Sequence, residues 1–245
     1  MNIVKSIVVW TAGIIFIIFF FPLTFLIWLI SLPFDKKRTI THWILIYQSL
    51  ALTRIVPIWK VKIEGREKFP KGMAGVIISN HQSILDILLI NCLRYRFRWI
   101  SKLENTKVPV LGWYLRMADY ITVDRGNSES KEDMLEKSYQ CLRQNISIVI
   151  FPEGTRSVNG EIGFFRRGAF QLAINAKKPV IPVIIDGSGG VLPKHGLVFN
   201  AGHMIKIKVF DPVMPDSFNT DDPDTLSLRF GNFMTEALRE MRDSK

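Results

Sequence analysis

The sequence predicts an α/β protein with a mixed, mostly parallel sheet flanked by helices and joined to an N-terminal membrane helix or helical hairpin. Three observations lead to this prediction. Residues 6–34 contain no charged side chain. After residue 60, short runs rich in Val and Ile alternate with segments of helical periodicity. The chain of 245 residues is 48% apolar and 22% charged, which excludes a disordered chain, a collagen, a coiled coil and a wholly intramembrane protein. We expect a membrane anchor and interfacial helix at residues 1–60, followed by one globular domain at residues 61–245.

The apolar run at residues 6–34 is long enough to cross a bilayer, which takes about 20 residues. A cleaved signal peptide fits less well, because its apolar region is about 7–15 residues long and ends in small residues. Pro22 removes a backbone hydrogen bond, so a single kinked span and a re-entrant hairpin are both open. Three basic residues at 36–38 follow the run and only Lys5 precedes it, so the positive-inside rule places the remainder in the cytoplasm.

A second apolar stretch at residues 41–58 carries one formal charge, on Arg54. An interfacial helix beside the first one and a core helix of the globular domain both fit this composition.

The elements that follow alternate between strands and helices. Uncharged runs predict strands buried on both faces at residues 75–79, 147–151 and 180–185. A further strand is expected at 120–123, and one at 204–210 is half-exposed because Lys206 and Lys208 alternate with apolar residues. Helices are expected at residues 83–93, 130–144 and 225–242. Ser130 and Asp133 form a capping-box pattern at the second of these helices.

His81 differs from the other histidines (His42, His195 and His203) because it falls where a strand gives way to a helix. Ligands bind at such strand ends in α/β sheets. Asp86, five residues on, would point about 140° away on one helix, so the two meet only if His81 lies in the turn and Asp86 in the first helical turn. The carboxylate would then hold one ring nitrogen and leave the other as a general base. A helix cap at Asp86 is the structural alternative.

A second cluster, Phe-Pro-Glu-Gly-Thr-Arg-Ser at residues 151–157, follows another strand. Pro152 ends the strand and Gly154 allows a tight turn. Arg156 is suited to hold a phosphate bidentately. An ordinary turn with an ion pair between Glu153 and Arg156 is the alternative.

The formal net charge of +10 points to anionic partners. Lys102, Arg125, Arg166 and Arg167 lie close to the two clusters in the sequence, and some of them are expected to hold a phosphorylated substrate while the others face anionic lipid. Nucleic acid is not an expected partner, because the chain has a membrane anchor and no recognisable nucleic-acid-binding motif. The two cysteines, Cys92 and Cys141, lack metal-ligand spacing, and we expect no metal.

Four segments resemble, in order, the motifs of the glycerolipid acyltransferase family, and in particular its lysophosphatidic acid acyltransferases: Asn-His-Gln-Ser-Ile-Leu-Asp at 80–86, residues 120–125, residues 151–157 and Val-Ile-Pro-Val at 180–183. The resemblance implies an acyltransferase domain that uses His81 and Asp86 as the catalytic pair. It also implies that Glu153, Gly154, Thr155 and Arg156 contact the acceptor's phosphate region, and that Arg125 binds substrate.

The reaction implied by the resemblance is acyl transfer from a thioester donor to the sn-2 hydroxyl of lysophosphatidic acid, giving phosphatidic acid at the cytoplasmic membrane. Acyl-CoA or acyl carrier protein would be the donor, lysophosphatidic acid and membrane lipid the other partners, and no cofactor would be needed. Backbone N–H groups after His81 are expected to stabilise the oxyanion. Ser83 is expected to cap the helix rather than act as a nucleophile.

Three other functions are weighed against this reaction. The first is a family member that acts on another lysolipid or on glycerol 3-phosphate. The second is a non-catalytic protein that binds anionic lipid, against which the intact His81 and Asp86 count. The third is a membrane-bound serine hydrolase, for which the chain lacks a Gly-x-Ser-x-Gly elbow.

Overall fold

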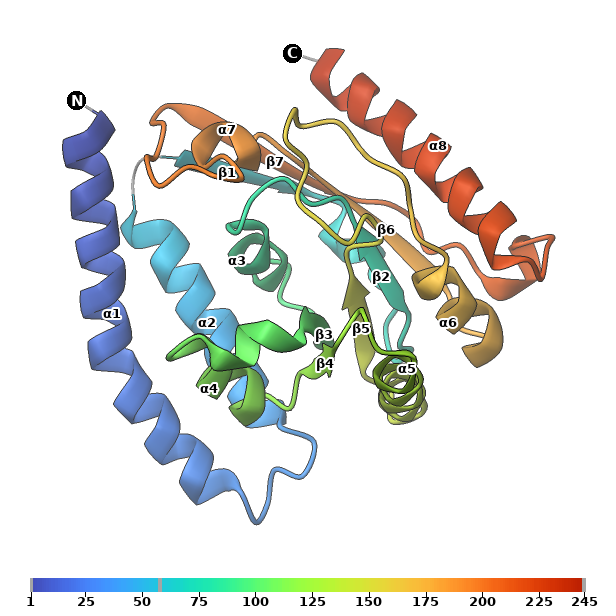
Figure 1. Ribbon diagram of the computed structural model, residues 1–245, viewed down its shortest axis with the longest axis horizontal. Coiled ribbons are helices and arrows are strands. Elements are labelled where there is room, and N and C mark those ends of the chain that lie inside the picture. Colours follow the sequence, from blue (N-terminus) through green and yellow to red (C-terminus); the bar gives the residue numbers. More distant parts are fainter. Residues whose placement is uncertain (1, 57–58, 244–245) are drawn as a thin grey trace.

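The computed structural model describes residues 2–56 and 59–243. Its centre is a seven-stranded sheet with the order β1-β7-β6-β2-β5-β3-β4 (Figure 1). The strands are β1 (Trp59–Glu64), β2 (Val76–Ser79), β3 (Phe97–Lys102), β4 (Ile121–Val123), β5 (Ser147–Ile150), β6 (Val180–Asp186) and β7 (His203–Val209). Neighbouring strands are parallel, except that β6 and β7 are antiparallel. The predicted fold class is confirmed.

Helices cover both faces of this sheet (Figure 1). They are α1 (Asn2–Ser31), α2 (Thr39–Ile55), α3 (Asp86–Asn91), α4 (Leu111–Met117), α5 (Ser128–Arg143), α6 (Gly168–Ala176), α7 (Ser188–Val191) and α8 (Pro223–Asp243), with 3-10 turns η1 (Arg66–Lys68), η2 (Leu103–Lys107) and η3 (Pro215–Ser217). Alternate residues of a strand point to opposite faces. Val76 and Ile78 of β2 therefore pack with α5, α6 and α8, whereas Ile77 packs with α3.

The central strands were predicted because they are buried on both faces: all four residues of β2 and the first six of β6 are inaccessible to solvent. β1 and β3 were not predicted. Lys60 and Lys62 point outward from β1, which pairs with β7 at the edge of the sheet. In β3, Arg98 interrupts the apolar run although its side chain is buried.

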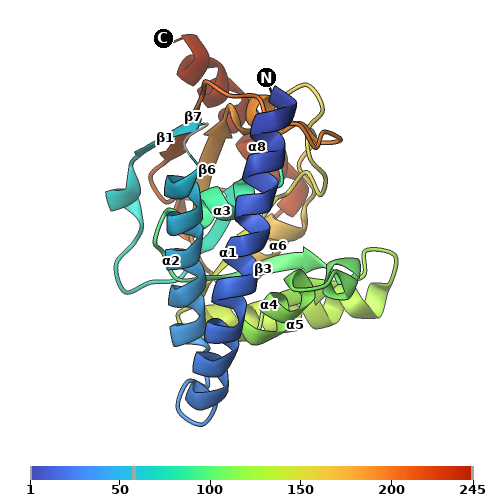
Figure 2. The ribbon, with the colours of Figure 1, turned by 90° about the vertical axis from the view of Figure 1, so that its left-hand side faces the viewer.

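The N-terminal helix α1 is continuous through Pro22, so the hairpin within residues 6–34 is not formed. Instead, α2 runs back beside α1, and the two helices form the hairpin together (Figure 2). The helical residues Ile3–Ser31 are long and apolar enough to cross a membrane. Only 6% of the most apolar segment of this helix is buried inside the protein.

One side of α1 packs on the globular part at two levels. The Trp10 indole donates to the Leu197 carbonyl over 2.8 Å, near the start of the helix. Further along, the Phe21 ring lies 5.2 Å from the ring of Trp113 in α4. The α1 helix is therefore attached to the domain over much of its length.

The second helix, α2, is a core element as well as a neighbour of α1. Ile46 and Leu50 pack with Cys92, and Ser49 accepts a hydrogen bond from Asn91 of α3 over 2.8 Å. The last two residues of the predicted stretch at 41–58 lie outside the described residues. The division of the chain at residue 60, which falls inside β1, stays a prediction.

The predicted cap of α5 is wrong. The helix begins at Ser128, and Asn127 is its N-cap because the Asn127 side chain accepts from the Ser130 amide over 3.1 Å. Ser130 instead accepts through its hydroxyl from the Asp124 amide over 2.9 Å. Asp133 pairs with Lys137 one turn on. An earlier asparagine supplied an equally strong capping side chain.

Candidate active site

Both predicted motifs lie at the same edge of the sheet. β2 and β5 are parallel neighbours, so their carboxyl ends meet. His81 follows β2 after one residue, and residues 151–157 follow β5 directly. Asn80 fixes the exit of β2, since its side chain both donates to and accepts from the backbone of Ile185 over 2.8 Å.

His81 and Asp86 meet in the arrangement that the sequence required. The Nδ1 atom of His81 lies 2.7 Å from Oδ2 of Asp86, with His81 in the turn and Asp86 opening α3. Asp86 is fully buried. An ionised carboxylate only accepts, so Nδ1 carries the proton and Nε2 keeps its lone pair. His81 lines a cavity, and its ring is set up to act as a base there.

The same carboxylate oxygen also holds the turn that precedes α3. It does not cap the helix, because α3 begins at Asp86 and its N-cap residue, Leu85, has no side-chain cap. Oδ2 of Asp86 accepts from the amides of Gln82 (2.7 Å) and Ser83 (2.9 Å). The expectation that amides after His81 stabilise an oxyanion is therefore wrong for these two, because both point at Asp86. The Ser83 hydroxyl donates to the Leu192 carbonyl over 2.7 Å and accepts from the Leu85 amide. Ser83 is thus a structural residue of the turn. The prediction that it caps the helix is wrong, because α3 begins only at Asp86 and its N-cap is Leu85.

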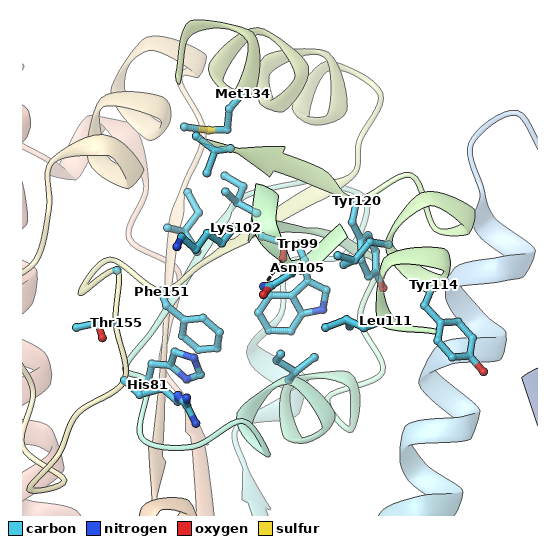
Figure 3. A pocket seen from close by; sticks show the side chains of 18 of the residues that line it. His81, Trp99, Lys102, Asn105, Leu111, Tyr114, Tyr120, Met134, Phe151 and Thr155 are labelled. Carbon is cyan, nitrogen blue, oxygen red and sulfur yellow. Dashed lines mark hydrogen bonds between the residues drawn. The ribbon is translucent and has the colours of Figure 1, made fainter. Parts of the chain in front are cut away.

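An aromatic stack fixes the plane of the imidazole. The His81 ring lies parallel to that of Phe151, with centroids 3.9 Å apart and an interplanar angle of 8°. The Trp99 ring in turn lies next to that of Phe151, with centroids 5.3 Å apart (Figure 3). Trp99 was not predicted as a site residue, because β3 was not predicted from the sequence. Phe151 was predicted only as the end of a strand.

The Glu153 carboxylate binds backbone groups of the site. It accepts from the His81 amide over 2.9 Å and from the Gly163 amide over 3.0 Å. Burial raises the pKa of Glu153, and these two hydrogen bonds oppose that rise. Glu153 is not among the described residues that line the cavity. Its expected contact with a substrate phosphate stays a prediction.

The cavity beside His81 has a volume of about 1090 Å³ (Figure 3). The predicted site residues that line it are His81, Lys102, Arg125, Gly154, Thr155 and Arg156. Arg166 and Arg167, which were expected to face either a phosphorylated substrate or lipid, line it as well. Two further cations in its wall, Lys131 and Lys194, were not predicted. Phe16 and Ile17 of α1 also contribute to its wall, so the cavity joins the charged end of the site to the apolar helix.

Two arginines close over the turn at Gly154. Arg125 donates to the Gly154 carbonyl, and burial together with the nearby charge of Arg166 lowers the pKa of Arg125. Gly154 has φ 71°, and a Cβ there would lie 3.0 Å from Nε of Arg166. Only glycine fits this turn without displacing Arg166. Two like charges so close together favour an anion beside them.

Comparison with known proteins agrees with this geometry. The family model for acyltransferases, described as "Acyltransferase", matches residues 60–186. The chain is 36% identical over 163 residues to the chloroplastic 1-acyl-sn-glycerol-3-phosphate acyltransferase of Arabidopsis thaliana, covering 66% of this chain and 46% of that protein. It is 32% identical over 184 residues to the human 1-acyl-sn-glycerol-3-phosphate acyltransferase alpha, covering 74% of this chain and 65% of that one.

Among solved structures, the chain is similar to the crystal structure of the 1-acyl-sn-glycerophosphate (LPA) acyltransferase PlsC from Thermotoga maritima. The TM-score is 0.81 at 22% identity, covering 98% of this chain and 96% of that one. The match spans about half the length of the chloroplast relatives. The matched family segment runs from the second residue of β1 to the end of β6, and it contains His81, Asp86 and the turn at Gly154. The chain belongs to the acyltransferase family.

Proposed function

We propose that this chain moves a fatty acyl group from a thioester donor to the sn-2 hydroxyl of lysophosphatidic acid, giving phosphatidic acid. One observation carries the proposal: a single cavity holds the oriented His81, a set of cations and apolar residues of α1. A base, a phosphate site and an apolar wall are what acylation of a lysophospholipid requires. The names of the acyltransferases of Arabidopsis thaliana and human support the same acceptor.

In the proposed reaction, Nε2 of His81 takes the proton of the acceptor hydroxyl as its oxygen attacks the thioester carbonyl. The C–S bond then breaks, and the protonated imidazole returns the proton to the departing thiolate. Asp86 stabilises the imidazolium between these steps, because its carboxylate lies 2.7 Å from Nδ1. A thioester is already activated, so the reaction needs no metal or cofactor.

We place the acceptor's phosphate among the cations of the cavity wall, namely Lys102, Arg125 and Arg156. The acyl chains would extend toward Phe16 and Ile17 of α1. With α1 in a membrane, a lysolipid could reach His81 while its tail stays in an apolar environment. The basic triplet at residues 36–38 supports a cytoplasmic position for the domain. Acyl-CoA and acyl carrier protein both fit as donors.

The test is product formation by the detergent-purified chain, measured by mass spectrometry with lysophosphatidic acid and long-chain acyl-CoA. His81→Ala serves as the matched variant. We expect phosphatidic acid from the wild type and a loss of about 10²–10⁴ in rate for the variant, the usual contribution of a general base. The variant should keep its fold, which circular dichroism checks, because Asp86 retains its hydrogen bonds to the amides of Gln82 and Ser83.

Other outcomes would redirect or end the proposal. If product forms only with an acyl carrier protein thioester, that thioester is the donor. If product forms only from another lysolipid, the proposal that lysophosphatidic acid is the acceptor is overturned. Undiminished activity of His81→Ala would overturn the mechanism.

A further inference from the structure

Residues 151–167 form a long loop that contains neither helix nor strand. Loops of this length are mobile unless other parts of the molecule hold them. This loop carries Gly154, Thr155 and Arg156, which line the cavity. Its first half is held by the catalytic turn, because the Ser157 amide donates to the His81 carbonyl over 2.7 Å.

The second half of the loop is held from α8. The Arg242 guanidinium donates through Nη2 to the Gly160 carbonyl (2.8 Å) and through Nη1 to Oε1 of Glu161 (2.7 Å). Its Nε atom donates to Oδ1 of Asp186 over 3.1 Å, at the end of β6. One side chain therefore joins the last turn of α8, the central sheet and the loop. Burial alone would lower the pKa of Arg242, but the hydrogen bonds and charges of Glu161 and Asp186 together raise it, so the side chain stays charged.

The same carbonyl links Arg242 to the catalytic turn. Gly160 also accepts from Nε2 of Gln82, the residue after His81, over 3.1 Å. Gly160 has φ 80°, and a Cβ there would lie 3.3 Å from Nη2 of Arg242. The guanidinium is therefore seated directly against the loop backbone. Phe165, near the end of the loop, packs in the same core cluster as Phe230 of α8.

We propose that Arg242 is a positioning residue for the substrate-binding loop: from α8 it holds Gly160 and Glu161, and so keeps Thr155 and Arg156 in place at the cavity. This inference rests on the proposed function. Arg242 does not line the cavity and takes no part in the chemistry. Without Arg242, the loop also adopts conformations that cannot bind the acceptor. The apparent affinity for the acceptor then falls in proportion to the fraction of molecules whose loop is in the binding conformation.

The kinetic test compares Arg242→Met, which keeps the aliphatic stem, with Arg242→Lys, which keeps the charge. We expect the KM for lysophosphatidic acid to rise about five- to tenfold in Arg242→Met, with kcat within about twofold and the KM for the donor unchanged. Arg242→Lys should recover part of the KM. Glu161→Gln should raise the KM less, and should add little when combined with Arg242→Met.

Arg239→Met is the matched control. Arg239 lies on the same helix, and its ion pair is with Glu236 one turn away, at 2.7 Å. It should leave the KM for the acceptor unchanged. A merely structural role of Arg242 would lower the melting temperature and kcat without a selective rise in the acceptor KM, and that pattern would overturn the inference.

A second measurement needs no activity. Limited trypsin digestion cuts after Arg156 when the loop opens, and the cleaved peptides are quantified by mass spectrometry. We expect cleavage several-fold faster in Arg242→Met than in the wild type or Arg239→Met. Equal cleavage rates would overturn the inference. If the wild type failed to acylate lysophosphatidic acid while cleavage still accelerated, the proposed acceptor would be wrong and the positioning role would stand.

Discussion

At the scale of single residues, His42 gives the molecule a measurable acid sensitivity. It lies on α2 and is buried against Phe97 of β3, and its Nε2 atom lies 3.0 Å from the Tyr95 carbonyl oxygen. Burial is the main cause that lowers its pKa from 6.5 to about 4, with further lowering by the charges of Arg98 and Arg96. In the folded protein His42 is therefore neutral over a range in which the unfolded chain takes up a proton.

We expect the stability provided by neutral His42 to be lost as the pH falls from about 6.5 to about 4, since the unfolded state binds the proton first. The lowering of the pKa of His42 corresponds to at most roughly 3 kcal/mol of unfolding free energy. Thermal melts in detergent between pH 7 and pH 4 measure it. His42→Gln should be less stable at pH 7 but should lose less on acidification. His195→Gln, at an exposed position, should show the same dependence of melting temperature on pH as the wild type. If the wild type and both variants all showed the same dependence, His42 would not be the source of the acid sensitivity.

The contact between His81 and Asp86 could be predicted from the sequence, whereas much of its surroundings could not. His81 and Asp86 lie in one short turn, so local geometry alone brings them together. Trp99 and Glu153 reach that turn through strand pairing and a loop, and their contacts with Phe151 and with the His81 amide depend on tertiary structure. Lys131, at the start of α5, could have been found from the strand-end rule applied to β4.

At the scale of secondary-structure elements, η2 and α4 together form one wall of the cavity. The backbones of these two elements approach each other unusually closely. A Cβ on Gly112 would lie 2.0 Å from the Thr106 carbonyl oxygen. Val110, just before it, has φ 65°, which is uncommon for a β-branched residue. The turn between η2 and α4 therefore depends on glycine at position 112.

Gly112→Ala should lower the unfolding free energy by about 1–3 kcal/mol, because the methyl group must displace backbone. The measurement is the melting temperature of the full chain in detergent. Gly168→Ala is the matched control. Gly168 also lies in the first turn of a helix, and no atom lies within 4 Å of the place that a Cβ would take there. The control should cause no loss of stability. A Gly112→Ala variant as stable as Gly168→Ala would show that the turn between η2 and α4 adapts easily.

The three central strands that were predicted share one property, which is that their burial is nearly uniform along a local segment. β2, β5 and β6 are covered on both faces and so appear as continuous apolar runs. β3 lies between β5 and the edge strand β4. It carries Arg98, whose guanidinium donates to the Lys37 carbonyl in the turn between α1 and α2. That partner belongs to a distant part of the chain, so no local pattern could mark Arg98 as buried.

At the scale of the whole molecule, α1 presents an apolar face away from the domain while its other side packs on it (Figure 2). Ile15 and Ile18 lie on the outward face and are 61% and 68% exposed. Such a face is stable in an apolar environment rather than in water.

The double variant Ile15→Glu with Ile18→Glu should reduce co-flotation of the full chain with phospholipid vesicles at least tenfold, because each charge costs about 2–3 kcal/mol in the bilayer interior. Leu228→Glu is the control, at a 60% exposed position on α8, on the opposite side of the molecule (Figure 1). It should float like the wild type. Unchanged flotation of the double variant would contradict membrane contact through this face.

The pairing of β1 with β7 has a consequence for the order of folding. Trp59 lies beside His203 in the sheet, and the strands between them pair among themselves in parallel through crossovers. During synthesis α1, α2 and β1 leave the ribosome long before β7 is made, so the edge strand waits without its partner. Such non-local pairing is slow. We therefore expect the apolar α1 helix to be available to a bilayer before the domain has closed beside it, so that the chain would complete its sheet at the membrane surface.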